Sequence, residues 1–167
     1  MKPMELVGVR VELPSNTPIV LLRALGEDGE SSESELMLPI FIGGPEATAI
    51  ALAHEGVEPP RPMTHDLFAE SLEAMDVQIE QVVITDLRDR TFFAELHMRG
   101  PDAARVISAR PSDAIALAVR LGVPIFAEDE LLAEVGYSDA PEETEEAAEV
   151  VEDFKDFLDS VNPEDFA

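Results

Sequence analysis

Hydrophobic and polar residues alternate along the first part of the chain. The alternation runs from Met4 to Leu13 and places four apolar residues on one face: Val7, Val9, Val11 and Leu13. A period of two is typical of a strand with one buried and one wet face. After the turn at Pro14–Asn16, a mostly apolar run from Thr17 to Leu25 suits an antiparallel partner. The two segments therefore predict an N-terminal hairpin.

Further strands are predicted where apolar runs or alternation recur. The run from Leu38 to Ile42 is too apolar for a half-exposed strand and contains Pro39, so we expect a buried strand near a sheet edge or bulge. Alternating residues predict a second hairpin over 76–87 and 91–98, in which Ala94, Leu96 and Met98 face the core. Short extended segments are predicted at 106–109 and 123–127.

Helical periodicity and small-residue runs predict four helices in the body of the chain. The first begins at about Pro45, after the turn made by Gly43 and Gly44. The second, 66–75, is expected to cover the sheet with one apolar face: Leu67, Phe68, Ser71, Leu72 and Met75. From Ala114 to Val119 every residue is apolar, so this third helix should be buried on nearly all sides. A short helix is predicted at 128–135.

These elements predict one α+β domain over residues 1–137, with a mixed, largely antiparallel sheet and covering helices. Residues 26–35 are expected to form an acidic, solvated loop. Residues 138–167 are expected to form an acidic tail, partly disordered, with a short amphipathic helix from about Ala147.

The formal charge of −25 changes the functional expectations. Twelve carboxylates and one lysine follow residue 138, so the tail carries −11 and the body −14. Such a surface repels phosphate, and it disfavours a nucleic-acid partner unless a basic patch or bridging metal ions intervene. Cysteine is absent, which excludes disulfides, thiolate zinc sites and a cysteine nucleophile. Without a signal peptide or an apolar run of membrane-spanning length, the sequence predicts a cytoplasmic protein with no membrane partner.

Three predicted helix starts carry a carboxylate with polar neighbours. Glu46 begins the first helix; Arg61, Thr64, His65 and Asp66 precede or begin the second; Arg110, Ser112 and Asp113 begin the third. Each carboxylate has a purely structural interpretation, because such residues cap a helix or complement its dipole. If the three starts converge, however, the carboxylates would form a site able to bind Mg²⁺ or Mn²⁺.

At these residues the sequence resembles the bifunctional nuclease domain family. The segments that carry the resemblance are LPIFIGGPEATAIALAHEG, RPMTHDLFAESLEAM, VVITDLRDRTFFAEL and ISARPSDAIALAVRLGVPIFAEDELL. The resemblance implies an α+β fold, a homodimer, and a nuclease acting on DNA and RNA. It also implies that eight polar residues match the family's motifs: Glu46, Arg61, Thr64, His65, Asp66, Arg110, Ser112 and Asp113.

The leading hypothesis is a metal-assisted phosphodiesterase. In it, Asp66, Asp113 and Glu46 hold the ion and His65 is a general base or a ligand. Substrate phosphate would be bound by the remaining polar residues: Arg61, Thr64, Arg110 and Ser112. Two alternatives stay open: a non-catalytic dimeric interaction or regulatory module, and a domain that binds a small anionic ligand at its helix starts.

Overall fold

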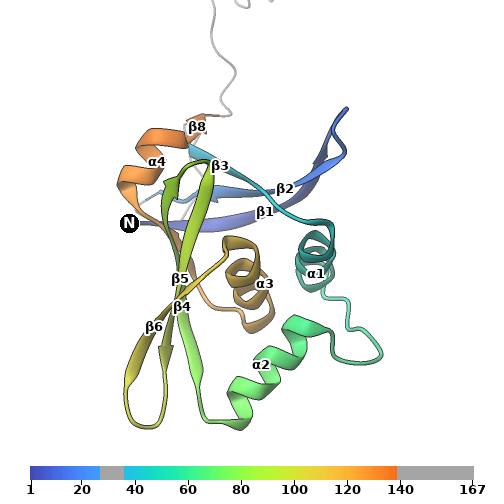
Figure 1. The fold of residues 1–167 in the computed structure, drawn as a ribbon, viewed down its shortest axis with the longest axis vertical. Coiled ribbons are helices and arrows are strands. Elements are labelled where there is room, and N and C mark those ends of the chain that lie inside the picture. The colour runs from blue at the N-terminus through green and yellow to red at the C-terminus, as the bar shows by residue number, and fades with distance from the viewer. Residues whose placement is uncertain (27–35, 139–167) are drawn as a thin grey trace, which may run out of the picture.

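The computed structural model describes residues 1–26 and 36–138, which form one α+β domain around a single mixed sheet (Figure 1). The eight strands lie in the order β6-β5-β4-β7-β1-β2-β3-β8. Their bounds are β1 Lys2–Glu12, β2 Thr17–Ala24, β3 Leu36–Phe41, β4 Gln78–Arg88, β5 Thr91–Arg99, β6 Ala104–Ala109, β7 Ile125–Ala127 and β8 Tyr137–Ser138. Only the β4–β7 pairing is parallel; the other neighbours are antiparallel. The predicted fold class is confirmed.

Four helices accompany the sheet in the described residues. They are α1 (Gly44–His54), α2 (Thr64–Ala74), α3 (Pro111–Leu121) and α4 (Asp129–Val135). Helices α1, α2 and α3 lie together on one side, whereas α4 lies beside β3 and β8 (Figure 1). None of the helices in these two ranges is long and apolar enough to cross a membrane.

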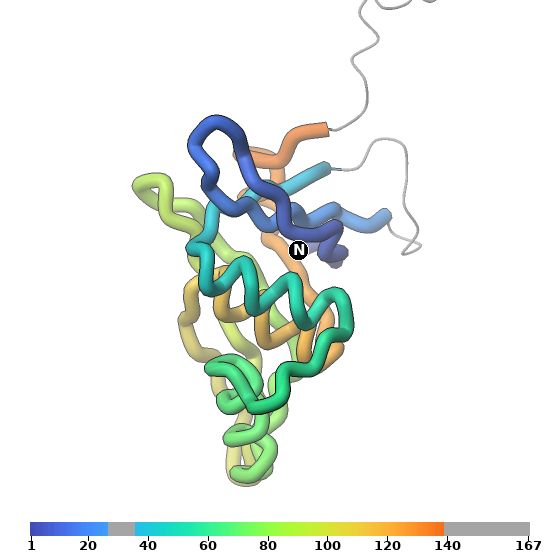
Figure 2. The backbone as a smooth tube through the Cα atoms, turned by 90° about the vertical axis from the view of Figure 1, so that its right-hand side faces the viewer, coloured from blue at the N-terminus to red at the C-terminus, as the bar shows by residue number. Residues whose placement is uncertain are grey.

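The centre of the core is α3, as its apolar run predicted. Ala114, Ile115 and Ala116 are fully buried, and Ala118 is nearly so. Because these side chains are mostly small, α1 can lie directly alongside α3 while α3 packs on β4 and β5 (Figure 2). Gly122 ends the helix in a left-handed conformation, with φ at 65°, which glycine adopts without steric cost.

The buried face predicted for the first strand is met only at Val9. A bulge between Leu6 and Gly8 shifts the register of β1 against β2. The extra residue reverses the alternation, because side chains in a strand point to opposite faces in turn. Met4 and Leu6 therefore pack on the core before the bulge, and Val9 packs on it after the bulge. Val11 and Leu13 lie on the same face as Val9 but are exposed, because this end of the hairpin extends beyond the helices (Figure 1).

The apolar face predicted for the second helix is also mostly wrong. Leu72 is buried, but Leu67, Phe68 and Met75 are exposed. The reason is that α2 packs chiefly against α3 at the margin of the domain instead of lying over the sheet. The acidic loop predicted at 26–35 and most of the predicted tail lie outside the described residues, so the domain boundary at 137 stays a prediction.

The buried position of Ala116 gives a test of the fold. Ala116→Glu should destabilise the domain by on the order of 4 kcal/mol or unfold it, because it places a carboxylate without a partner in the core. Ala133→Glu, at an exposed position of α4, is the matched control and should change stability little. Thermal unfolding measures both. Unchanged unfolding of Ala116→Glu would contradict the central place of α3.

Candidate functional site

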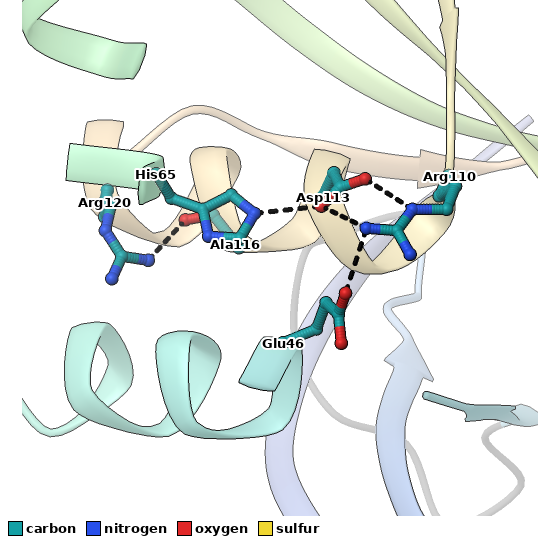
Figure 3. A network of polar contacts seen from close by, with 6 residues as sticks. All are labelled: Glu46, His65, Arg110, Asp113, Ala116 and Arg120. Atoms are coloured by element: carbon teal, nitrogen blue, oxygen red, sulfur yellow. Dashed lines mark hydrogen bonds and ion pairs between the residues drawn. The ribbon is translucent and has the colours of Figure 1, made fainter. Parts of the chain in front are cut away.

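The first turns of α1, α2 and α3 bring four of the predicted site residues together (Figure 3). Glu46 comes from α1, His65 from α2, and Asp113 from α3, with Arg110 directly before α3. We call these four residues the polar cluster. The three helix starts thus lie together, with Glu46, Asp113 and His65 as their polar residues, while Asp66 lies in another contact.

Arg110 links two carboxylates of the cluster. Its Nε donates to Asp113 Oδ2 at 2.7 Å, and its Nη2 donates to Asp113 Oδ1 at 3.1 Å and to Glu46 Oε1 at 2.9 Å. The backbone of Arg110 is extended, as expected for a residue that precedes a proline, here Pro111. Its side chain is 66% exposed, and Nη1 has no partner in the described part of the chain. Arg110 could therefore contact a bound anion while it holds both carboxylates.

The second contact of Asp113 is with His65. Asp113 Oδ1 lies 3.0 Å from His65 Nε2. Burial by itself raises the pKa of Asp113, but hydrogen bonds from Arg110 and His65 and their charges outweigh burial and hold the pKa below its ordinary value. The carboxylate is therefore ionised at neutral pH and can only accept. His65 Nε2 must donate, which leaves Nδ1 as the basic nitrogen of a neutral ring.

Asp66 lies in a separate ion pair. Its Oδ1 accepts a hydrogen bond from Arg120 Nε, and its Oδ2 accepts one from the Met63 backbone N–H at 2.8 Å. Arg120, only 9% exposed, also donates from Nη1 to the Ala116 carbonyl at 3.1 Å. Burial raises the pKa of Asp66, but the hydrogen bonds from Arg120 and Met63 outweigh it and the pKa is lowered. Asp66 therefore both caps α2 and joins it to α3.

The three carboxylates expected to bind a metal do not form one ligand set. Asp113 lies in the first turn of α3, whereas the partner of Asp66, Arg120, lies seven residues further, about 10 Å along the helix. Glu46 and Asp113 both accept from Arg110, which occupies the space between them. Within residues 1–26 and 36–138, no group of three or more His, Asp or Glu side chains is placed to hold a metal ion.

The remaining predicted residues lie around the polar cluster in different environments. Arg61 and Thr64 are exposed at the start of α2, and Arg61 has no ion-pair partner among the described residues. Ser112 is buried in the first turn of α3 and so does not face solvent. Sequence analysis missed Arg120. The only sequence feature that could have pointed to it is that it is a single cation in the last turn of an otherwise apolar helix. A cation at that position is also common because it interacts favourably with the helix dipole.

The sequence matches a known protein family. A sequence model described as the bifunctional nuclease domain matches residues 29–140. An uncharacterized protein of Mycobacterium tuberculosis is 45% identical over 171 residues, covering 99% of this chain and 98% of that protein.

Plant proteins are more distant relatives. Bifunctional nuclease 2 of Arabidopsis thaliana is 30% identical over 116 residues, 68% of this chain and 34% of that protein. The bifunctional nuclease of Oryza minuta is 29% identical over 102 residues, 59% of this chain and 30% of that protein. The chain thus spans about a third of the length of these plant relatives and nearly all of the mycobacterial one.

The lowered pKa of Asp66 predicts how stability depends on pH. In the unfolded chain the carboxyl group titrates near 3.8, so its ion pair stabilises the fold above that value. The stabilisation should disappear as pH falls through the lower folded pKa. Asp66→Asn should therefore reduce the slope of the unfolding free energy between about pH 5 and about pH 3. Denaturant unfolding at several pH values measures this slope.

A control separates loss of the ion pair from loss of charge. Asp76 is exposed, and asparagine tolerates its positive φ of 55°. Asp76→Asn should keep the stability of the parent protein at neutral pH, whereas Asp66→Asn should lower it. Equal pH slopes for Asp66→Asn and the parent would contradict the role assigned to the pair.

Proposed function

Because the chain belongs to the bifunctional nuclease domain family, we propose that it is a nuclease that hydrolyses phosphodiester bonds of DNA and RNA at the polar cluster. The observation that carries the proposal is the contact between His65 Nε2 and Asp113 Oδ1 at 3.0 Å, next to an exposed guanidinium. A carboxylate that orients an imidazole is a recurring arrangement for general acid–base chemistry.

In the proposed mechanism, His65 is the general base. Asp113 accepts from Nε2 and stabilises the imidazolium that forms when Nδ1 takes a proton from the attacking water. As the water oxygen bonds to phosphorus, the P–O bond to the leaving oxygen breaks, and that oxygen takes a proton from solvent. Arg110 binds a phosphate oxygen through Nη1, and its position is held by Glu46 and Asp113. Arg61, in the loop before α2, and Thr64, the first residue of α2, are both exposed and would contact neighbouring phosphates. Ser112 is buried and is assigned no contact with the phosphate.

The acidic body limits how such a protein binds its substrate. Residues 1–138 carry −14, so few lysines and arginines face the phosphates beyond the cluster. Mg²⁺ or Mn²⁺ would supply charge neutralisation between phosphate and carboxylate when bound. Since the described carboxylates are not gathered into one ligand set, no step of the mechanism is assigned to the ion.

Two histidines with similar contacts allow a matched test of the proposed site. His65→Ala and Asp113→Asn should each lower kcat for single-stranded RNA and DNA by about 100-fold or more, because proton transfer is lost. His97, whose Nε2 lies 3.3 Å from Glu95, is on β5 and alternates with the core residues Leu96 and Met98. His97→Ala should therefore keep the parent rate.

The assay uses protein purified in chelator, with and without added Mg²⁺ or Mn²⁺. This treatment exposes contaminating nuclease, whose activity would be indifferent to all three substitutions. Absence of cleavage by the parent protein under every condition, or equal rates for the parent and His65→Ala, would sink the nuclease proposal.

A second candidate function is a non-catalytic dimeric interaction module, and the exposed edge of the sheet favours it. Among residues 1–26 and 36–138, strand β6 pairs with β5 on one side and with no strand on the other, which leaves its outer backbone donors and acceptors without a strand partner there. Its Val106 and Ile107 are exposed, and Met75 of α2 borders the same apolar groove as Ile107. The apolar character of this edge suits a protein better than a nucleic acid.

A second copy of the chain fits the β6 edge. Residues 103–110 contain two arginines and no carboxylate, so pairing here keeps the acidic surfaces of two copies apart. In an antiparallel pairing centred on Ile107, Arg105 lies opposite Ala109 of the partner subunit and Val106 opposite Ser108 of the partner subunit. No like charges face each other, and both copies keep their helices on the same side of the extended sheet.

Because the natural chain has no cysteine, one introduced thiol can locate this interface. Directly opposite Cα atoms in antiparallel strands are about 4.5–5.5 Å apart, within the range for a disulfide. Ile107→Cys should therefore form a covalent dimer under mild oxidation. Val11→Cys, at an exposed strand position in another hairpin, should not. The product is measured on non-reducing gels.

Sedimentation of the parent protein completes the test. We expect twice the chain mass of 18.2 kDa. A monomer at high concentration would refute the dimer, and a dimer without cross-linking of Ile107→Cys would place the interface elsewhere.

A further inference from the structure

Helix α2 is attached to α3 mainly by polar contacts. Of its apolar residues, only Leu72 is buried, so broad hydrophobic packing does not define its position. Beside the pair of Asp66 and Arg120 lies a pocket of about 330 Å³, open to solvent, which both residues line. Because close packing is missing there, the geometry of α2 depends on the side chains that bridge to α3.

Two adjacent residues of α2 reach two different points on α3. His65 contacts Asp113, and Asp66 contacts Arg120. Asp113 and Arg120 are seven residues apart, so they lie on nearly the same face of α3, two turns from each other. Consecutive residues of a helix point in different directions. The two contacts together therefore define both the position and the rotation of the first turn of α2.

Of the residues that make these two contacts between α2 and α3, Arg120 is held most rigidly. Its 9% exposure and its hydrogen bond to the Ala116 carbonyl, one turn back on α3, immobilise the guanidinium. Asp66 is in turn fixed by the Met63 N–H at the start of α2. We infer that Arg120 is a positioning residue that acts through Asp66 to hold the His65 ring against Asp113. The inference deepens the proposed function and rests on it for its kinetic consequence.

The structural part of the inference can be tested without any substrate. At about pH 8, above the ordinary titration range of histidine, the ¹⁵N spectrum of His65 should show one tautomer, protonated at Nε2. Arg120→Gln should leave a mixture of tautomers, because Nε2 no longer stays within reach of Asp113. Arg120→Lys keeps a cation near Asp66 and should restore much of the parent spectrum. His65→Ala assigns the resonance.

The kinetic part separates positioning from substrate binding. Arg120→Gln should lower kcat by about 10- to 100-fold, as expected for a displaced catalytic group, and leave KM unchanged because Arg120 does not contact the phosphate. Asp66→Asn should have a similar effect, and the double variant should be no worse than either single one.

Arg99→Gln is the matched control. It breaks another arginine–carboxylate pair, Arg99 with Glu80 at 2.6 Å, whose side chains are both exposed. It should keep the parent kcat and the parent His65 spectrum.

The outcomes distinguish the two proposals. A parent His65 spectrum in Arg120→Gln would overturn the positioning role, whatever the activity. If Arg120→Gln does not fold, Asp66→Asn and Arg120→Lys carry the same spectral test. If the parent protein cleaves nothing but the spectra change as expected, the nuclease proposal fails and the positioning of His65 stands.

Discussion

The burial of α3 is the constraint on which the rest of the structure depends. Alanines at 114, 116 and 118 let α1 and the sheet approach this helix closely from different sides. Because α3 directly follows β6 and leads through a short turn into β7, its position also determines where β7 is inserted into the sheet. Strand β7 lies between β4 and β1 and unites the two antiparallel halves of the sheet. The polar residues at both ends of α3 are positioned by the same packing.

Charge is distributed unevenly between the surface and the helix interfaces. The protein is strongly acidic, yet the carboxylates between α1, α2 and α3 each accept from an arginine: Glu46 and Asp113 from Arg110, and Asp66 from Arg120. Removing one partner would leave a partly buried charge without compensation, which is more costly than losing a surface pair. These contacts therefore hold the helices in register. Asp113 Oδ1 accepts from both Arg110 and His65, so the same carboxylate that pairs with the arginine also orients the imidazole.

The polar cluster both connects the three helices and has features of a reactive site. Arg110 is engaged with two carboxylates but remains largely exposed, and His65 is oriented by Asp113 while one ring nitrogen stays basic. Family membership favours phosphodiester chemistry for this arrangement. The acidic body opposes nucleic-acid binding, so a long-range electrostatic attraction is not part of the proposed mechanism. Substrate recognition would depend on short-range contacts with Arg61 and Arg110.

The sequence by itself determined seven of the eight described strands, the four described helices and the buried state of α3, because these follow from local alternation, helix-start signals and the run of apolar residues at 114–119. It could not show β8, whose two residues carry no periodic pattern. It also identified the helix starts that carry the site. It could not show the bulge before Gly8, since one extra residue reverses a strand's faces without changing its composition.

Only the tertiary structure decided which charges meet. The pairs are His65 with Asp113, Asp66 with Arg120, and Glu46 with Arg110, whose members lie 48, 54 and 64 positions apart in the chain. They depend on how α1 and α2 pack against α3. For that reason Asp66 pairs with Arg120 and not with the cluster around Asp113.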